Sequence, residues 1–268
     1  MKKRTVGLIY NAKRPGTDEK KFFKVAKKMN IEIVPFNLAS ELDEEEIKEK
    51  AKKCEFIYNN TGEYIAYETV KMLEELGSNV FEKSKVIYFP EDKWIFSVEC
   101  RKNKIPIPET ILLSCDLSSA KKELKHFGKW PVILKRIYGE RGEFVERAEN
   151  ISQAIEIIKE FWEKGNERFP IIAQEYINSE SYRVLLIGGE IVQTARKKRS
   201  GWKASGSSSE KFWKFKVDKE LEKISKKVAK MSGIKICGID FAKKNNKWIV
   251  IEVNAEPSLK FYDSEHEL

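Results

Sequence analysis

The chain carries two apolar runs close together, Lys235-Ile-Cys-Gly-Ile-Asp-Phe-Ala242 and Lys247-Trp-Ile-Val-Ile-Glu-Val-Asn254. Both are short and rich in β-branched residues, and four polar residues separate them, which is the pattern of two neighbouring strands. Each run also holds a carboxylate among apolar neighbours, where an unpaired charge would be costly. We therefore expect two buried strands that also carry a polar site.

Three oxygen-bearing side chains on these runs, Asp240, Glu252 and Asn254, form a candidate metal site. Because side chains alternate between the two faces of a strand, Glu252 and Asn254 share one face. Asp240 on the neighbouring strand is placed to meet them there. Oxygen ligands on rigid strands suit Mg²⁺, which binds substrate phosphates as well. The alternative is a hairpin whose polar residues simply face solvent.

A second candidate site follows the apolar run Pro131-Val-Ile-Leu-Lys135. A lysine that ends a buried strand needs an anion for its ammonium group, and phosphate is the natural one. Gly139 and Gly142 in the next loop allow backbone amides to approach phosphate oxygens. An ordinary surface lysine is the other interpretation. The chain has neither a GxxxxGK[ST] loop nor a GxGxxG fingerprint, so any nucleotide site has another architecture.

The first ninety residues alternate β-rich runs with charged amphipathic helices, which predicts a small parallel α/β domain. The remainder predicts two α+β lobes, and the expected domains are residues 1–90, 91–175 and 176–268. Strands are expected at residues 5–10, 31–36, 55–58, 109–113, 131–135, 144–146, 171–177, 182–187, 191–195, 235–242 and 247–253. Helices are expected at residues 18–29, 64–76, 151–164 and 219–232. Two further helices are expected, one that begins at residue 43 and one that follows Pro90 and ends near residue 103.

Six short motifs, taken in order, resemble the ATP-grasp superfamily and specifically its RimK-like amino-acid ligases of the alpha-L-glutamate type. The resemblance covers nearly the whole chain. The motifs are Asp92-Lys93, Pro131-Val-Ile-Leu-Lys135 with Gly139 and Gly142, Gln174-Glu-Tyr-Ile177, Tyr182-Arg183-Val-Leu-Leu-Ile-Gly-Gly189, Gly238-Ile-Asp240 and Glu252-Val-Asn254.

The resemblance implies an α/β (α+β) ATP-grasp fold, in which ATP lies between two antiparallel sheets of the central and C-terminal lobes. Lys93 and Lys135 are then the lysines that contact phosphates. The backbone of Gln174, Glu175, Tyr176 and Ile177 would hold adenine. Asp240, Glu252 and Asn254 would bind Mg²⁺, with Mn²⁺ as the alternative ion. Arg183 and Arg196 resemble the basic residues that face the transferring phosphate and the acyl substrate.

These assignments have structural alternatives. Lys93 is also explained as a helix-surface lysine, residues 174–177 as a core strand, and Arg183 as an ion-pair partner of Glu180. Two positions depart from the family's pattern. Ser181 stands where relatives usually have an aspartate linked to ribose contact, with Glu180 as the candidate substitute, and Ser205 stands where they tend to have an asparagine. A protein that binds ATP without turning it over therefore stays open.

Composition narrows the class of protein. Lysine and arginine number 51 against 42 acidic residues, and the net charge of +9 suits an acidic partner, a nucleic acid or simply lysine-rich solvated helices. Two histidines make triads and histidine metal sites improbable, and four scattered cysteines indicate a reducing compartment. The apolar runs are too short for a signal peptide or a membrane span, so a cytoplasmic protein is expected.

The implied chemistry is phosphoryl transfer from ATP to a carboxylate, followed by attack of an amine on the acyl phosphate. We expect glutamate or a similar amino acid as the amine. The acceptor is expected to be an acidic protein tail, an acidic amino-group carrier protein as in lysine or arginine biosynthesis, or a small cofactor. A homo-oligomer is left open. A nucleic-acid-binding protein is the alternative of another class, but it leaves the acidic residues of the metal site unexplained.

The segment 196–210 is expected to form a mobile basic lid over the substrates. It opens with the basic run Arg196-Lys-Lys-Arg199 and continues through Gly201, Gly206 and a serine tract. Such a composition is too polar to form a core, and its charge would favour an acidic acceptor.

Overall fold

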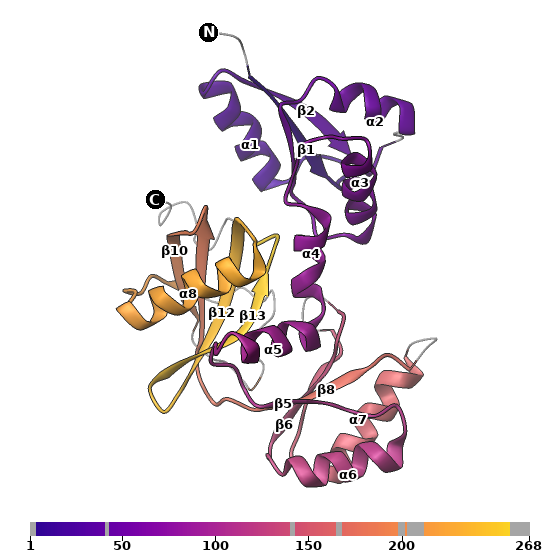
Figure 1. Ribbon diagram of the computed structural model, residues 1–268, viewed down its shortest axis with the longest axis vertical. Helices are drawn as coiled ribbons and strands as arrows, with labels where there is room; N and C mark the ends of the chain where they lie inside the picture. The colour runs from indigo at the N-terminus through magenta and orange to yellow at the C-terminus, as the bar shows by residue number, and fades with distance from the viewer. Residues whose placement is uncertain are drawn as a thin grey trace. The chain divides into compact units, whose positions relative to one another are not determined.

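The computed structural model describes residues 4–40, 43–139, 143–164, 168–197, 202 and 212–257 (Figure 1). Its contacts group the chain into two compact units. The first unit contains residues 1–88 together with the segments 234–237 and 255–268, and the second contains residues 89–233 and 238–254. The division into three domains at residues 90 and 175 stays a prediction.

The first unit contains a four-stranded parallel sheet in the order β2-β1-β3-β4. The chain leaves β1 toward β2 and then crosses back to β3, so right-handed connections place α1 on one face and α2 and α3 on the other (Figure 1). The strands are β1 (Arg4–Tyr10), β2 (Ile31–Asn37), β3 (Phe56–Asn59) and β4 (Val80–Phe81), and the helices are α1 (Thr17–Lys28), α2 (Glu44–Ala51) and α3 (Tyr64–Glu75).

Close packing within this sheet requires a glycine at position 7. A Cβ atom there would lie 2.8 Å from both Ile57 Cγ1 and Phe36 Cε2, a separation that real Cβ atoms do not adopt. Ile9 and Tyr67 are fully buried in the same unit. The alternating strands and helices predicted for this part of the chain are confirmed, and the structure adds the short strand β4 and the helix α4 (Ser84–Glu91).

A late segment of the chain completes the first unit. Ile236 packs against the cluster of Leu8, Tyr10 and Tyr58, on the face that α1 covers with Phe22 and Phe23. The backbone N–H groups of Lys235 and Ile236 both donate to Glu82 Oε1, at 2.6 and 3.0 Å. Burial raises the pKa of the Glu82 carboxyl, and the two donated hydrogen bonds act against this effect.

The second unit begins with an antiparallel sheet in the order β5-β8-β6-β7, which packs against α6 and α7. Its core includes Leu134, Leu124 and Ile158, all fully buried. Helix α6 was not predicted, although Asp116 caps its first turn and Gly128 ends it with a φ of 63°. The elements are β5 (Thr110–Leu112), α6 (Leu117–Phe127), β6 (Val132–Arg136), β7 (Val145–Ala148), α7 (Ile151–Glu163) and β8 (Ile171–Glu175).

A five-stranded sheet in the order β11-β10-β9-β12-β13 follows, and α8 packs on β9 and β13. Asp218 caps α8 through Leu221 N–H and also accepts a hydrogen bond from Trp248 Nε1 at 2.8 Å, which joins the helix to β13. The elements are β9 (Ser181–Ile187), β10 (Glu190–Lys197), β11 (Phe212–Trp213), α8 (Lys219–Ser232), β12 (Ile236–Lys244) and β13 (Lys247–Asn254), and the helices α4 (Ser84–Glu91) and α5 (Lys93–Lys102) precede both sheets.

Among the described residues, no helix has the length and apolar character needed to cross a membrane.

Candidate active site

The predicted metal ligands lie on one face of the β12–β13 pair. Asp240 pairs directly with Glu252, and Gly238 pairs with Asn254, so alternation along the strands puts the three polar side chains on the same side. Asn254 Nδ2 donates to the Gly238 carbonyl at 3.4 Å. Two carboxylates that face each other across a strand pair repel unless a cation compensates them. This donor set fits Mg²⁺, which is commonly bound through one or two carboxylates and substrate phosphates.

Arg183 on β9 supplies one compensating charge. Its Nε and Nη2 atoms donate to Asp240 Oδ1 and Oδ2, each at 2.5 Å, and the Asp240 charge raises the pKa of Arg183. Arg183 therefore pairs with Asp240 and not with Glu180, the alternative left open from the sequence. Burial raises the pKa of Glu252, and the neighbouring charge of Asp240 raises it further. A divalent cation would relieve this repulsion at Glu252.

Lys135 ends β6 as a buried lysine with an exposed fraction of 9%. Its Nζ donates to Gln174 Oε1 at 2.8 Å, and Gln174 Nε2 donates to Thr110 Oγ1 at 3.1 Å, so β8 and β5 orient the ammonium group. Burial lowers the pKa of Lys135, while the charge of Glu252 acts in the opposite direction. The predicted phosphate lysine and the predicted metal site therefore belong to one electrostatic cluster.

Lys93 lies against the loop that follows β6. Its Nζ donates to the Gly139 carbonyl at 2.8 Å, and its backbone N–H donates to the Ile137 carbonyl at 3.1 Å. The positive charge of Lys93 is also among the lesser causes, after burial, that lower the pKa of Lys135. Lys93 is thus brought together with Lys135 instead of standing alone on the surface of α5. Gly139 has a φ of 138°, which glycine tolerates, and Gly142 lies outside the described residues.

The predicted adenine segment is the connection from β8 to β9. Glu175 forms an ion pair with Lys244 of β12, and the Arg147 guanidinium lies 4.4 Å from the centre of the Tyr176 ring. Ile177 follows β8 in irregular structure, because the strand ends at Glu175 and not at residue 177 as expected. A role for this segment in holding adenine stays a prediction.

Arg196 is not brought together with Arg183. In the β9–β10 register Arg196 pairs with Tyr182, whereas Ala195 pairs with Arg183, so the two arginines lie on opposite faces of the sheet. Arg196 lies 5.9 Å from the centre of the Trp213 ring, and its Nε is 3.8 Å from Glu180 Oε2. Glu180 also accepts a hydrogen bond from the Tyr182 hydroxyl at 3.1 Å. Glu180 is therefore held by Tyr182 and Arg196.

Lys197 was predicted only as part of the mobile basic lid, but it is the last residue of β10 and lies on the same face as Arg183. Lys197 pairs with Ser181, two residues before Arg183, and its exposed fraction is 9%. The alternation of side chains along β10 would have separated it from Arg196 if the register with β9 had been known. The rest of the predicted lid, at residues 198–201 and 203–210, lies outside the described residues.

Comparison with known proteins identifies the family of this chain. Residues 91–267 match the RimK-like ATP-grasp domain, and the chain belongs to this family. The chain is 26% identical over 202 residues to the coenzyme gamma-F420-2:alpha-L-glutamate ligase of Methanocaldococcus jannaschii, which covers 73% of this chain and 68% of that protein. The predicted ATP-grasp fold and RimK-like relationship are confirmed, and the protein is an ATP-grasp ligase, an enzyme that forms carbon–nitrogen bonds.

Two solved structures show the same fold. The D-alanine–D-alanine ligase of Bacillus anthracis complexed with ATP has a TM-score of 0.75 at 17% identity, covering 97% of this chain and 88% of that one. The ATP-grasp ligase PsnB complexed with a minimal precursor, Mg and ADP has a TM-score of 0.69 at 13% identity, covering 95% and 90%.

Proposed function

We propose that this chain uses MgATP to join glutamate, or a similar amino acid, to a carboxylate acceptor through an acyl phosphate. The observation that carries the proposal is the cluster in the second unit. Two facing carboxylates, Asp240 and Glu252, are electrostatically linked to Lys135, which is supplied by a different sheet. The name of the Methanocaldococcus relative supports glutamate as the amino acid.

Some side chains of the cluster position the phosphates, and others neutralise negative charge. Lys135 and Lys93 offer ammonium groups to phosphate oxygens, and Gln174 orients the first of them. Arg183 stabilises negative charge that develops on the transferred phosphoryl group or on the tetrahedral oxyanion. Mg²⁺ held by Asp240, Glu252 and Asn254 would neutralise phosphate charge, and the Mg–ADP complex of PsnB supports this ion. No enzyme nucleophile is required.

Two acceptor classes are candidates. The Methanocaldococcus relative is named for a coenzyme, which favours a small cofactor that carries a carboxylate. The net charge of +9 favours an acidic protein tail or carrier protein. The four cysteines are free thiols, which supports the reducing cytoplasm as the location.

The test is ATP-dependent release of phosphate with glutamate and a panel of acidic peptides and carboxylate cofactors, with products identified by mass spectrometry. Asp240→Asn should lower the rate by about 100-fold or more, because the site loses a carboxylate that would hold Mg²⁺ and that orients Arg183. Lys121→Ala, on the exposed surface of α6, is the control. ATP binding without phosphate release would instead indicate an inert binder, and full activity of Asp240→Asn would refute the site.

A further inference from the structure

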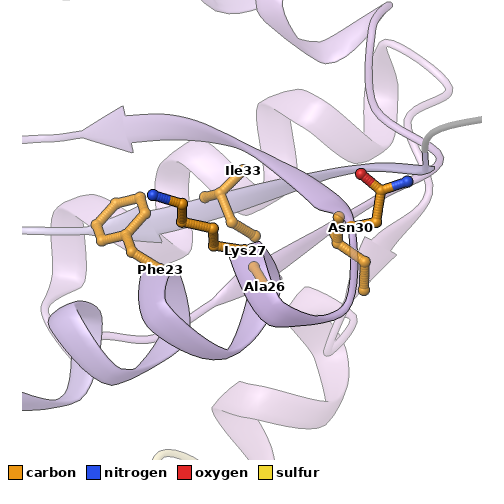
Figure 2. A pocket seen from close by; sticks show the side chains of 6 residues that line it. Phe23, Ala26, Lys27, Asn30 and Ile33 are labelled. Carbon is orange, nitrogen blue, oxygen red and sulfur yellow. The ribbon is translucent and has the colours of Figure 1, made fainter.

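A small groove lies on the first unit, between the C-terminal half of α1 and the beginning of β2 (Figure 2). Figure 2 shows Phe23, Ala26 and Lys27 of the helix beside Ile33 of the strand, with Asn30 at the turn between them. The groove encloses about 230 Å³, and Ile31 completes its lining. Its lining therefore combines the apolar side chains of Phe23, Ala26, Ile31 and Ile33 with the polar side chains of Lys27 and Asn30.

The size of the groove argues against a small-molecule site. Pockets for cofactors and drug-sized ligands occupy about 300 to 1,000 Å³. A volume of about 230 Å³ open to solvent suits one or two apolar side chains presented by a larger partner.

Lysines line the flank of α1 that borders the groove. Lys20, Lys24 and Lys27 are spaced so that they follow one side of the helix, and all three are exposed. In the described part of the chain, no acidic side chain forms an ion pair with any of them. The acidic residues of α1 lie elsewhere: Glu19 Oε1 accepts a hydrogen bond from Asn60, and the Asp18 charge acts on Tyr58. The groove is thus bordered by uncompensated positive charge.

The neighbouring strand restricts the kind of partner. β2 is the outermost strand of its sheet, and Pro35 within it has no N–H group to donate to a further strand. Extension of the sheet by a partner strand is therefore disfavoured. A helix or loop that inserts side chains into the groove meets no such obstacle.

We propose that this groove is a docking surface for an acidic segment of a partner protein. An apolar side chain of the segment enters the groove, and its carboxylates face Lys20, Lys24 and Lys27. The inference rests on the proposed function in one respect, since the partner would be the acidic protein that carries the acceptor carboxylate. Other occupants fit less well. A second copy would oppose two lysine-rich helices, and a nucleic acid would contact the lysines but leave the apolar side chains of the groove unused.

The first test uses a short fluorescein-labelled peptide, rich in glutamate with two adjacent leucines, and fluorescence anisotropy with the full chain. The variant Lys20→Gln/Lys24→Gln/Lys27→Gln should bind it about tenfold more weakly, because three charge contacts with the glutamates are lost. The matched variant Lys121→Gln/Lys122→Gln/Lys125→Gln removes the same charge from the exposed surface of α6 and should bind as the wild type does. Equal weakening by both variants would overturn the proposal.

Two altered peptides test the two halves of the surface. Replacing glutamates by glutamines, or the leucines by serines, should each weaken binding, and unchanged binding of the serine peptide would overturn the role of the groove. Displacement of the peptide by duplex DNA, or a wild-type dimer in sedimentation that the α1 variant dissociates, would assign the surface to another occupant and also overturn the proposal.

A separate measurement distinguishes failure of the docking proposal from failure of the proposed function. Calorimetry with ATP, and phosphate release with glutamate and a small acceptor, do not involve α1. Absence of phosphate release would count against the ligase activity, whereas equal peptide binding with normal ATP affinity would count against the docking surface alone.

Discussion

The cations of the second unit's active site and the lysines of α1 in the first unit are held in different ways. In the site each cation has an internal acceptor: Arg183 has Asp240, Lys135 has the amide oxygen of Gln174, and Lys93 has the Gly139 carbonyl. On α1, Lys20 and Lys24 have no ion-pair partner among the described residues. Internal acceptors fix a charge in one place, which suits phosphates bound at close range. Unpaired surface lysines remain adaptable, which suits a docking partner.

The same contrast appears between the two helices that cover opposite faces of the parallel sheet. On α2, Lys48 lies 2.8 Å from Glu44 and 2.9 Å from Glu45, and Lys50 lies 2.7 Å from Glu46. The charges of α2 therefore compensate one another within the helix. The charges of Lys20, Lys24 and Lys27 on α1 are available to another molecule.

The largest effect is expected from a substitution that removes a cation with an internal acceptor. Lys135→Ala should weaken ATP binding by about 100-fold, because a charge-assisted hydrogen bond to phosphate contributes about 1.5 to 3 kcal/mol. Calorimetry measures the affinity, and thermal unfolding monitors the fold. Lys24→Ala on α1 is the matched control and should bind ATP normally. Equal ATP affinity of wild type and Lys135→Ala would show that the buried lysine has only a structural role.

The next largest effect is a loss of stability, expected when the carboxylate of Glu82, which accepts hydrogen bonds from two backbone N–H groups, is removed. Glu82→Ala should destabilise the protein by about 2 kcal/mol, because the N–H groups of Lys235 and Ile236 lose their shared acceptor. Glu82→Gln keeps an oxygen at the same position and should retain most of that stability in urea denaturation.

The pH dependence of the Glu82 variants sharpens this result. The raised pKa of Glu82 means that its ionisation opposes folding progressively as the pH rises from the unfolded-state value through the folded-state value. The stability of Glu82→Gln relative to the wild type should therefore increase across that range. A constant difference between the two proteins at all pH values would contradict the assigned effect of burial.

A smaller effect is expected from a substitution that removes an acceptor and leaves its cation in place. Gln174→Ala should weaken ATP binding by about tenfold, because Lys135 loses a hydrogen bond that holds its ammonium group in place. Without that acceptor the already lowered pKa of Lys135 should fall further, so ATP affinity should begin to decline at a lower pH than in the wild type. Calorimetric titrations at a series of pH values measure both changes. Identical pH profiles would show that Gln174 does not position the lysine.

The smallest effect is expected on the melting temperature, when one lysine is removed from α2 or from α1. Lys48→Ala on α2 removes two ion pairs within the helix and should lower the melting temperature slightly, whereas Lys24→Ala on α1 should leave it unchanged. Salt should reduce the effect of Lys48→Ala, because surface ion pairs are screened. A larger loss of stability at Lys24 than at Lys48 would mean that α1 has a structural use for its charge.

The local sequence pattern was sufficient to predict much of the fold and part of the candidate site. The shared face of Glu252 and Asn254 follows from the period of two along a strand, and the strands themselves were apparent from β-branched runs between polar turns. The ordered motifs were sufficient for the RimK-like family, which the match over residues 91–267 confirms. Helix α6 was also within reach, because Asp116 and Gly128 are local cap signals that were not used.

Contacts between residues distant in the chain were decided only by the tertiary structure. The pairing of Arg183 with Asp240, and the placement of Lys197 instead of Arg196 on the face of Arg183, depend on how neighbouring strands are registered. A shift of one residue would exchange the faces, and the amino-acid order of one strand does not specify its register with another. The passage of segment 234–237 into the first unit, where Glu82 accepts its N–H groups, has the same origin. The alternation of side chains is a local property of the strand backbone. Which side chains contact each other across strands depends on the packing of the whole unit.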